Sequence, residues 1–220
     1  MRFYKTAWWV RQVLPQYTWK ITAQKPTIFL TFDDGPIPEV TDFVLEQLEQ
    51  YKAKATFFCV GDNVRKYPEI YNRVIEGGHH VGNHTYNHLN GWKTNDKAYL
   101  DNIAQCQQVM VENASENIAK EEPQKPLFRP PYGKIRKQQM KQLSLDYQVI
   151  MWDVLTYDFD AQLSSERCLE KAIECTTSGS IVVFHDSVKS VDKLRQVLPQ
   201  YLKHFAEKGF TFEAINYQEN

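Results

Sequence analysis

Two short clusters in this 220-residue chain hold the side chains best suited to binding a metal ion. Asp33 and Asp34 are adjacent and follow an apolar run, and His84 and His88 stand four positions apart. Two histidines at that spacing lie on one face if residues 84–88 form a helical turn, so both can reach one ion. With one aspartate they make a three-ligand site open to water and substrate, as catalytic metal sites are. We therefore expect Asp34, His84 and His88 to bind a divalent metal ion, the alternative being surface histidines without a ligand role.

Asp33 is expected to move a proton rather than to bind the ion. Successive side chains of an extended chain point in opposite directions, so Asp33 and Asp34 cannot easily reach the same ion. This leaves Asp33 free to act as a general base towards the attacking water. The alternative interpretation is a simple turn, because the Asp-Gly-Pro sequence at 34–36 is common turn chemistry.

A stiff loop of sequence RPPYG, residues 129–133, follows a short apolar pair. The guanidinium of Arg129 can hold the Asp33 carboxylate in a bidentate pair that keeps it ionised and oriented. A backbone N–H near Tyr132 can meet the oxyanion that forms when an amide carbonyl is attacked. The alternative is a rigid surface turn with a solvated arginine.

His185 directly follows the apolar run 180–184 and suits a general acid that protonates a departing amine. Asp158 follows another apolar run, and a carboxylate beside an imidazole raises the pKa of that imidazole. We therefore expect Asp158 to stabilise protonated His185. A histidine that merely caps a strand is an equally good interpretation of His185 alone.

Apolar patterning predicts the elements that must position these residues. Near-continuous apolar runs, typical of strands buried on both faces, cover residues 27–32, 55–60, 147–152, 180–184 and 210–214. Shorter and weaker strands are expected at 80–82 and 127–129. Apolar residues spaced by three and four predict helices over 40–51, 64–76, 95–112, 134–144, 164–177 and 191–205. This alternation predicts mostly parallel strands in an α/β barrel, closed or nearly closed, with an open doubly wound sheet as the alternative. The candidate residues all fall in or just after predicted strand ends, where sites of such proteins form.

Length and composition narrow the class of protein. A chain of 220 residues with 42% hydrophobic residues fits one domain with a full core. A net charge of -1 gives no electrostatic case for binding nucleic acid. The four cysteines form no Cys-x-x-Cys pair, and we interpret them as buried thiols.

Residues 1–26 are expected to form an N-terminal extension ahead of a catalytic domain at 27–217. The extension mixes basic and aromatic residues, so it either packs across a barrel end or contacts a membrane surface peripherally. No apolar stretch within it is long enough for a signal peptide or a spanning helix. We therefore expect a protein that is cytoplasmic or peripheral at the membrane surface.

Three segments resemble, in order, the motifs of the polysaccharide deacetylase family, the NodB-homology domains of carbohydrate esterase family four. They are TFDDG at 31–35, HTYNH at 84–88 and RPPY at 129–132, within a match that runs from about Thr27 to Ile215. The ordered set is highly specific, whereas a single motif is not. The resemblance implies a distorted (β/α) barrel and a metal-dependent N-deacetylase, a hydrolase acting on carbon–nitrogen bonds other than peptide bonds.

The resemblance implies that the ion is bound by Asp34, His84 and His88. It implies that Asp33 is the base, oriented by Arg129. It also implies that His185 is the acid, with its pKa tuned by Asp158. The ion would be zinc, or else cobalt, nickel or manganese. Val183 would help to line the pocket for the acetyl methyl group. Two positions depart from the family pattern, because Leu155 stands where an aspartate is frequent and Phe159 where a tryptophan is frequent.

We therefore predict hydrolysis of the N-acetyl amide of an N-acetylglucosamine-type sugar in a glycan or glycan precursor, with release of acetate. The expected partner is a carbohydrate that carries N-acetyl groups. Two alternatives are a non-catalytic glycan-binding module of the same fold and a deformylase or amidase acting on another small amide. Loops at 61–66, 89–95 and 153–163 are expected to set specificity, and their aromatic side chains can stack on sugar rings or simply pack. These side chains are Trp92, Tyr157 and Phe159.

Overall fold

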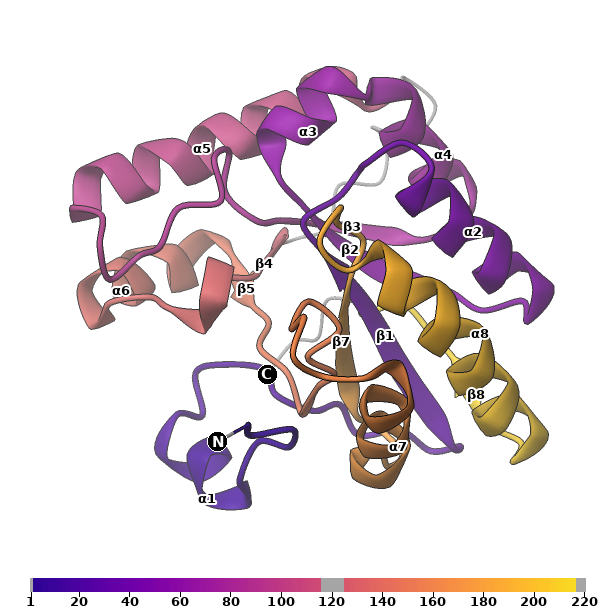
Figure 1. Cartoon of the computed structure of the whole chain (residues 1–220). Coiled ribbons are helices and arrows are strands. Elements are labelled where there is room, and N and C mark those ends of the chain that lie inside the picture. Colours follow the sequence, from indigo (N-terminus) through magenta and orange to yellow (C-terminus); the bar gives the residue numbers. More distant parts are fainter. Residues whose placement is uncertain (1, 116–124, 217–220) are drawn as a thin grey trace.

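A computed structural model describes residues 2–115 and 125–216, and its centre is a curled parallel sheet. Within these residues, seven strands follow the order β5-β4-β3-β2-β1-β7-β6, and β8 pairs with the start of β1. The strands are β1 (Thr27–Asp33), β2 (Ala55–Cys59), β3 (His80–Asn83), β4 (Leu127–Phe128), β5 (Gln148–Val149), β6 (Val154–Leu155), β7 (Ile181–His185) and β8 (Thr211–Phe212). Helices surround the sheet (Figure 1), and the strand path is open between β5 and β6. The expected distorted (β/α) barrel is thereby confirmed.

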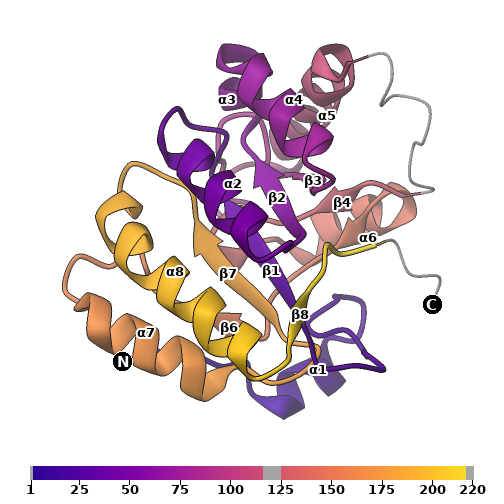
Figure 2. The ribbon, with the colours of Figure 1, turned by 90° about the vertical axis from the view of Figure 1, so that its right-hand side faces the viewer.

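Eight α-helices and one short 3-10 turn lie in the described part of the chain. They are α1 (Trp8–Val13), α2 (Val40–Gln50), α3 (Gly61–Lys66), α4 (Pro68–Glu76), α5 (Asp96–Asn113), α6 (Lys137–Asp146), α7 (Ser165–Cys175), α8 (Val191–Glu207) and the turn η1 (Pro131–Gly133). Figure 2 shows α2, α8 and α7 side by side over the outer face of β1 and β7.

The structure corrects the predicted elements at several points. The segment 64–76 is divided at Tyr67, because Pro68 begins α4 and a residue before proline disfavours helical backbone. The prediction of a loop at 61–66 is wrong, since these residues form α3. The predicted strand at 147–152 shrinks to β5, and neither β6 nor α1 was predicted.

The side chains of β1 alternate between the two faces of the sheet. Ile28, Leu30 and Phe32 belong to the large apolar cluster that packs helices against the sheet. Phe29 belongs to a second apolar cluster inside the barrel, which includes residues from β2, β4 and β7. Asp33 ends the same inward-facing row, at the C-terminal end of β1. The interior of the barrel is therefore apolar, and the Asp33 carboxylate lies at its C-terminal end.

The N-terminal segment pairs with both open edges of the sheet. Beside β5, the Thr18 amide donates to the Val149 carbonyl at 3.0 Å, and the Met151 amide donates to the Thr18 carbonyl at 2.8 Å. In β6, the Leu155 amide donates to the Tyr4 carbonyl at 3.0 Å. None of the helices in residues 2–115 and 125–216 is long and apolar enough to cross a membrane. The expected domain end at residue 217 lies outside the described residues.

Candidate active site

The register of the parallel strands brings the candidate residues together at one rim. Asp33, the last residue of β1, lies opposite His185 of β7 and Phe58 of β2. Asn83, the last residue of β3, lies opposite Cys59 of β2 and Phe128 of β4. The residues that follow these strands, including Asp34, His84 and Arg129, therefore emerge at the same end of the barrel.

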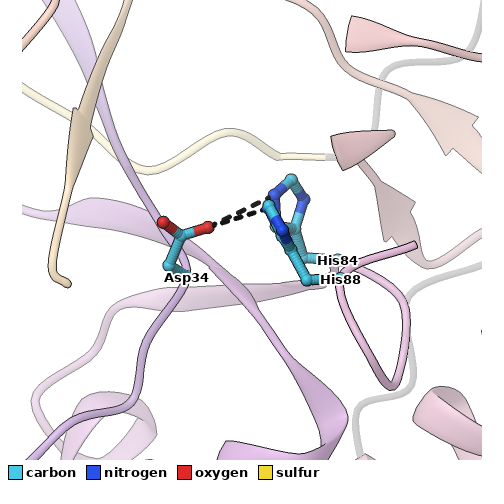
Figure 3. A group of neighbouring side chains, drawn as sticks. All are labelled: Asp34, His84 and His88. Carbon is cyan, nitrogen blue, oxygen red and sulfur yellow. Dashed lines mark ion pairs between the residues drawn. The ribbon is translucent and has the colours of Figure 1, made fainter. Parts of the chain in front are cut away.

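Asp34, His84 and His88 point their ligand atoms at one another. The Oδ1 atom of Asp34 lies 3.1 Å from Nε2 of His88 and 3.7 Å from Nε2 of His84 (Figure 3). The three ligand atoms all lie within 4.8 Å of one another. Among the described residues, Asp34 Oδ1 is buried and accepts no hydrogen bond. The structure thus brings together the three predicted ligands.

The protonation state of His84 indicates whether this cluster suits a cation. His84 Nδ1 lies 2.8 Å from the Arg129 carbonyl, which can only accept, so Nδ1 carries the proton and Nε2 presents its lone pair. Burial is the main cause that lowers the pKa of His84 to about 4, so the ring is neutral at pH 7. A lone pair therefore faces the Asp34 carboxylate. Two acceptors in that arrangement repel each other unless a cation lies between them, and an oxygen with two imidazole nitrogens suits a divalent metal ion.

The backbone holds Asp34 in an unusual conformation with φ of 86°. The Asp34 amide donates to the Phe58 carbonyl at 3.3 Å, and the Asn63 side-chain amide donates to the Asp34 carbonyl at 2.8 Å. The next amide, of Gly35, donates to Oδ1 of Asp186 at 3.0 Å. A β-carbon on Gly35 would lie 2.0 Å from Oδ2 of Asp186, so only glycine fits this turn.

The expectation of a helical turn at 84–88 is wrong. Thr85 and His88 have left-handed backbone, with φ of 64° and 55°, and the segment is a loop. The loop is fixed from inside, because Oδ1 of Asn83 accepts from the Thr85 amide at 2.9 Å, and Oγ1 of Thr85 accepts from the Leu89 amide at 3.0 Å. Both imidazoles still reach Asp34, through this loop rather than through helical spacing.

Asp33 and Arg129 form a buried ion pair beside the metal-ligand cluster. Nη1 of Arg129 donates to Oδ1 of Asp33 at 2.7 Å and also to Oγ1 of Thr31 at 2.7 Å. Nη2 donates to the Met151 carbonyl at 2.9 Å. The predicted bidentate pair is therefore wrong, because the other guanidinium donors bond to backbone carbonyls across the barrel. Because Arg129 bonds only to Oδ1 of Asp33, Oδ2 accepts no hydrogen bond from the guanidinium.

His185 and Asp158 form a second pair at the same rim. Nδ1 of His185 lies 2.7 Å from Oδ1 of Asp158, and the His185 amide donates to Oδ2 of Asp158 at 2.7 Å. Burial disfavours the charged imidazole, but the carboxylate of Asp158, with smaller contributions from Asp34 and Asp33, raises the pKa of His185 to about 9. His185 is therefore protonated at neutral pH in this environment.

One exposed aromatic ring packs against His88 and another packs against His185. Tyr132, 60% exposed and with φ of 60°, packs against His88 with ring centroids 4.7 Å apart. Phe159, 40% exposed, packs against His185 with centroids 4.8 Å apart. Trp92 lies in the turn that precedes α5. Its side chain is 58% exposed and donates to the Ile135 carbonyl.

Val183 is 1% exposed and lies in register with Thr31 of β1 and Leu155 of β6. It occupies the inward-facing row of β7 two residues before His185, because side chains alternate along a strand. Its methyl groups therefore lie below the rim that carries His185.

Sequence reasoning missed two residues that shape the site, Asn63 and Asp186. Asn63 lies in a segment predicted as a loop, and its bond to the Asp34 carbonyl depends on α3. Asp186 directly follows His185 in the sequence, and that adjacency was the one available signal. Oδ2 of Asp186 accepts from the Thr41 hydroxyl at 2.6 Å. Both residues hold the turn at Asp34 in place.

Comparisons with known proteins agree with this geometry. Residues 20–150 match the polysaccharide deacetylase family. Two peptidoglycan-N-acetylglucosamine deacetylases of Bacillus cereus are similar to this chain. One is 34% identical over 182 residues, covering 80% of this chain and 63% of the relative. The other is 31% identical over 201 residues, covering 90% of this chain and 91% of the relative.

A solved structure is similar over nearly the whole chain. The crystal structure of a peptidoglycan N-acetylglucosamine deacetylase in complex with an N-oxidanyl-benzamide ligand superposes with a TM-score of 0.78. The two sequences are 31% identical, and the match covers 96% of this chain and 95% of that one. The predicted resemblance is confirmed, and the chain belongs to the polysaccharide deacetylase family.

Proposed function

We propose that this protein hydrolyses the N-acetyl amide of an N-acetylglucosamine-type sugar in a glycan or glycan precursor and releases acetate. One observation carries the proposal. The rim combines a three-ligand metal cluster with a carboxylate held by Arg129 and with a protonated imidazole held by Asp158. A cation site, a base and an acid are what hydrolysis of an unactivated amide requires. The names of the similar proteins support the sugar class.

Asp34, His84 and His88 would hold the metal ion. When bound, a divalent ion there supplies Lewis-acid chemistry, polarising the amide carbonyl and lowering the pKa of a water molecule towards about 7. Zinc is the proposed ion, because a carboxylate and two neutral imidazoles with room for water match its catalytic sites. Cobalt, nickel and manganese are the proposed substitutes. His84 is oriented by its bond to the Arg129 carbonyl.

Asp33 is the proposed general base. Its Oδ1 atom is held by Arg129, and Oδ2 is the atom available to accept a proton from the attacking water. Asp33 is 4% exposed, so bulk water does not solvate this carboxylate freely. Arg129 fixes the direction of the carboxylate, because the guanidinium is itself held by two backbone carbonyls.

His185 is the proposed general acid that donates its Nε2 proton to the departing amine. Nδ1 is engaged by Asp158, so Nε2 is the nitrogen left to face the substrate. Val183 lies below it in the same inward row and is the proposed contact of the acetyl methyl group. The exposed rings of Tyr132 and Phe159 are proposed to contact the sugar from two sides, and the Tyr132 amide is the proposed oxyanion donor.

The experiment is to incubate zinc-loaded protein with N-acetylated chito-oligomers, peptidoglycan fragments and lipid-linked N-acetylated sugars, and to measure acetate. N-formylated analogues of the same sugars test the deformylase alternative. We expect acetate release from at least one acetylated substrate, and release at least about 100-fold slower from the Asp33→Asn variant. If no acetylated substrate yields acetate with zinc, cobalt, nickel or manganese, the proposal fails. Saccharide binding that Asp33→Asn leaves unchanged would then favour a non-catalytic module.

We also propose that the protein is cytoplasmic or peripheral at a membrane surface, with α1 as the contact. Trp8, Trp9 and Val13 are 70%, 56% and 67% exposed, and α1 buries none of its residues. Aromatic side chains in a segment without acidic residues suit the interface of an anionic bilayer. In both views α1 lies away from the C-terminal ends of β1 and β2, so a surface bound there leaves the rim free (Figures 1 and 2).

Sedimentation with vesicles tests this contact. We expect the protein to bind vesicles that contain phosphatidylglycerol more strongly than vesicles of phosphatidylcholine alone, and the double variant Trp8→Ser, Trp9→Ser to bind neither. Equal behaviour of the two proteins would contradict the proposal. A concentration-dependent dimer that the same variant abolishes would assign α1 to a second copy of the chain instead.

A further inference from the structure

The first residues of the chain run alongside the loop that follows β6, and that loop carries Asp158 and Phe159. The Leu155 amide donates to the Tyr4 carbonyl at 3.0 Å, and the Thr6 amide donates to the Asp153 carbonyl at 2.8 Å. These bonds pair the N-terminal segment with β6, directly before the loop, as a short edge strand would. The strand from which the loop extends is therefore held by the N-terminal segment.

Side chains extend this contact to both sides of Asp158. The rings of Tyr4 and Tyr157 pack edge to face with centroids 5.1 Å apart. The hydroxyl of Tyr157 accepts from the Phe3 amide at 3.0 Å. On the far side, Nε of Arg2 pairs with Oδ2 of Asp160 at 2.7 Å.

Tyr157 is a position where the backbone needs such support. Its φ is 59°, a left-handed conformation that is costly for a bulky residue and persists only where surrounding contacts hold it. The side-chain contacts described above come from Phe3 and Tyr4, and both belong to the N-terminal segment. The segment therefore helps to hold the backbone of the residue that directly precedes Asp158.

The contacts continue from Tyr157 to the proposed acid. Tyr157 packs against Phe159 with centroids 5.7 Å apart, and Phe159 packs against His185 at 4.8 Å. Asp158, between these two rings in the sequence, bonds to both Nδ1 and the backbone amide of His185. A displacement of Tyr157 would therefore move both of the loop side chains that contact His185.

A buried carboxylate fixes the N-terminal segment to the barrel. Asp153 is fully buried, and Oγ of Ser180 donates to it at 2.6 Å. Its cationic partners in residues 2–115 and 125–216 are Arg11 and Lys5, both from the N-terminal segment. A buried carboxylate without a cation is costly, so folding favours the state in which the segment is bound.

We propose that residues 2–6, anchored through Arg11, form a strap that positions Asp158 and through it the acid His185. Tyr4 is the principal positioning residue, because its ring packs against Tyr157 of the loop and its carbonyl bonds to Leu155 at the end of β6. The proposal deepens the proposed deacetylase function and rests on it for the role of His185. The contact between strap and loop is a claim about structure that can be measured separately.

The test compares Tyr4→Ala with Tyr4→Phe, which keeps the ring, and with Gln12→Ala, an exposed residue of the same segment, in zinc-loaded full-length protein. Loss of one aromatic contact should lower kcat of Tyr4→Ala by about 3- to 10-fold. Zinc content should change little, because the ligands are not touched. KM should rise less than kcat falls, because Tyr132, the other ring proposed to contact the sugar, is not touched. Tyr4→Phe and Gln12→Ala should behave as wild type.

A double variant shows whether Tyr4 acts through Asp158. If it does, Tyr4→Ala added to Asp158→Asn should lower kcat by less than about 2-fold further, because coupled residues are not additive. Effects that simply multiply would overturn the proposal. So would a Tyr4→Ala protein that is less stable but has unchanged kcat, since that result would mean a purely structural role.

The proton on Nδ1 of His185 gives a readout that does not depend on activity. Bonded to Asp158, it should give a downfield proton signal in NMR spectra that disappears in Asp158→Asn. We expect this signal to shift or broaden in Tyr4→Ala and to persist in Tyr4→Phe. If wild type releases no acetate, the proposed function fails while this signal still tests the strap, and an unchanged signal rejects the strap alone. If Tyr4→Ala does not fold, Arg2→Ala, at a partly exposed pair, should show the same change to a smaller extent, and its absence would reject the strap.

Discussion

Arg129 donates a single hydrogen bond of 2.7 Å to Asp33, and both side chains lie in the interior of the barrel. Arg129 is fully buried, stacks over the Phe58 ring at 4.1 Å, and bonds to carbonyls that follow β5. The pair therefore joins β1 to the far side of the sheet. The pair stabilises the barrel, and it also orients the carboxylate that we propose as the general base.

Replacing Arg129 by methionine is expected to destabilise the protein by about 3–5 kcal/mol, because Asp33 would remain buried without its cation. The double variant Arg129→Met, Asp33→Asn should recover part of this loss while staying inactive. Urea denaturation of the two variants measures the difference. A double variant no more stable than Arg129→Met would show that the lost packing of Arg129, and not the unpaired charge, causes the loss.

Asp33→Asn is expected to keep its metal and to lower turnover by at least about 100-fold, the scale of a lost general base. The amide retains the shape of the carboxylate and can still contact Arg129, but it cannot take a proton. Metal content by mass spectrometry and acetate release should be measured on the same sample. A variant that is purified without metal would mean that the roles of Asp33 and Asp34 are wrongly assigned.

His88→Ala is expected to weaken zinc binding and to abolish stabilisation by zinc. In wild type, free zinc at 100 times its Kd should stabilise the folded state by about 2.7 kcal/mol, seen as a rise in Tm. His80→Ala is the matched control, since His80 bonds to the Ile215 carbonyl away from the cluster. Equal zinc responses of the two variants would exclude His88 as a ligand.

The activity is expected to fall as the pH rises through about 9, where His185 loses its proton and can no longer act as the acid. Asp158→Asn removes the main charge that raises this pKa, so the alkaline limb of kcat/KM should move towards the ordinary value of 6.5. A bound cation would cancel the contribution of Asp34 to the raised pKa of His185. Asp158 would then remain the main charge that raises this pKa. A pH–rate profile with an unmoved alkaline limb would assign that limb to another group.

Gly35→Ala is expected to lose most of its affinity for zinc. The new β-carbon would meet the Asp186 carboxylate at 2.0 Å, so the turn that presents Asp34 must shift. Gly209→Ala is the control, because no atom lies within 4 Å of the added carbon and the φ of 77° supplies only a local backbone strain away from the clash with Asp186. Zinc titration should separate the two, and equal affinities would show that the turn adapts.

Much of the site could be predicted from the sequence, because residue type and order carry that information. The apolar run before Asp33 predicts a buried strand, and the one before His185 predicts another. Parallel strands place their C-terminal ends at one rim, so the candidate residues were expected to meet there. Alternation of strands and helices predicted the barrel for the same local reason.

Local patterns misled where proline or left-handed backbone intervened. Pro68 divided one expected helix, and the left-handed conformations of Thr85 and His88 replaced the expected helical turn. Spacing alone could not reveal these conformations, because hydrogen bonds from Asn83 and to Thr85 stabilise them within the folded loop.

The sequence by itself determined which side chains can bind a cation, take a proton or give one, and that strand ends would carry them. Only the tertiary structure decided that Arg129 contacts Asp33 through one bond, that Asp186 holds the turn at Gly35, and that Tyr4 packs against Tyr157. These contacts join residues some 96 to 153 positions apart. Which residues meet in these contacts depends on how the sheet curls and closes. No periodicity within either segment predicts it.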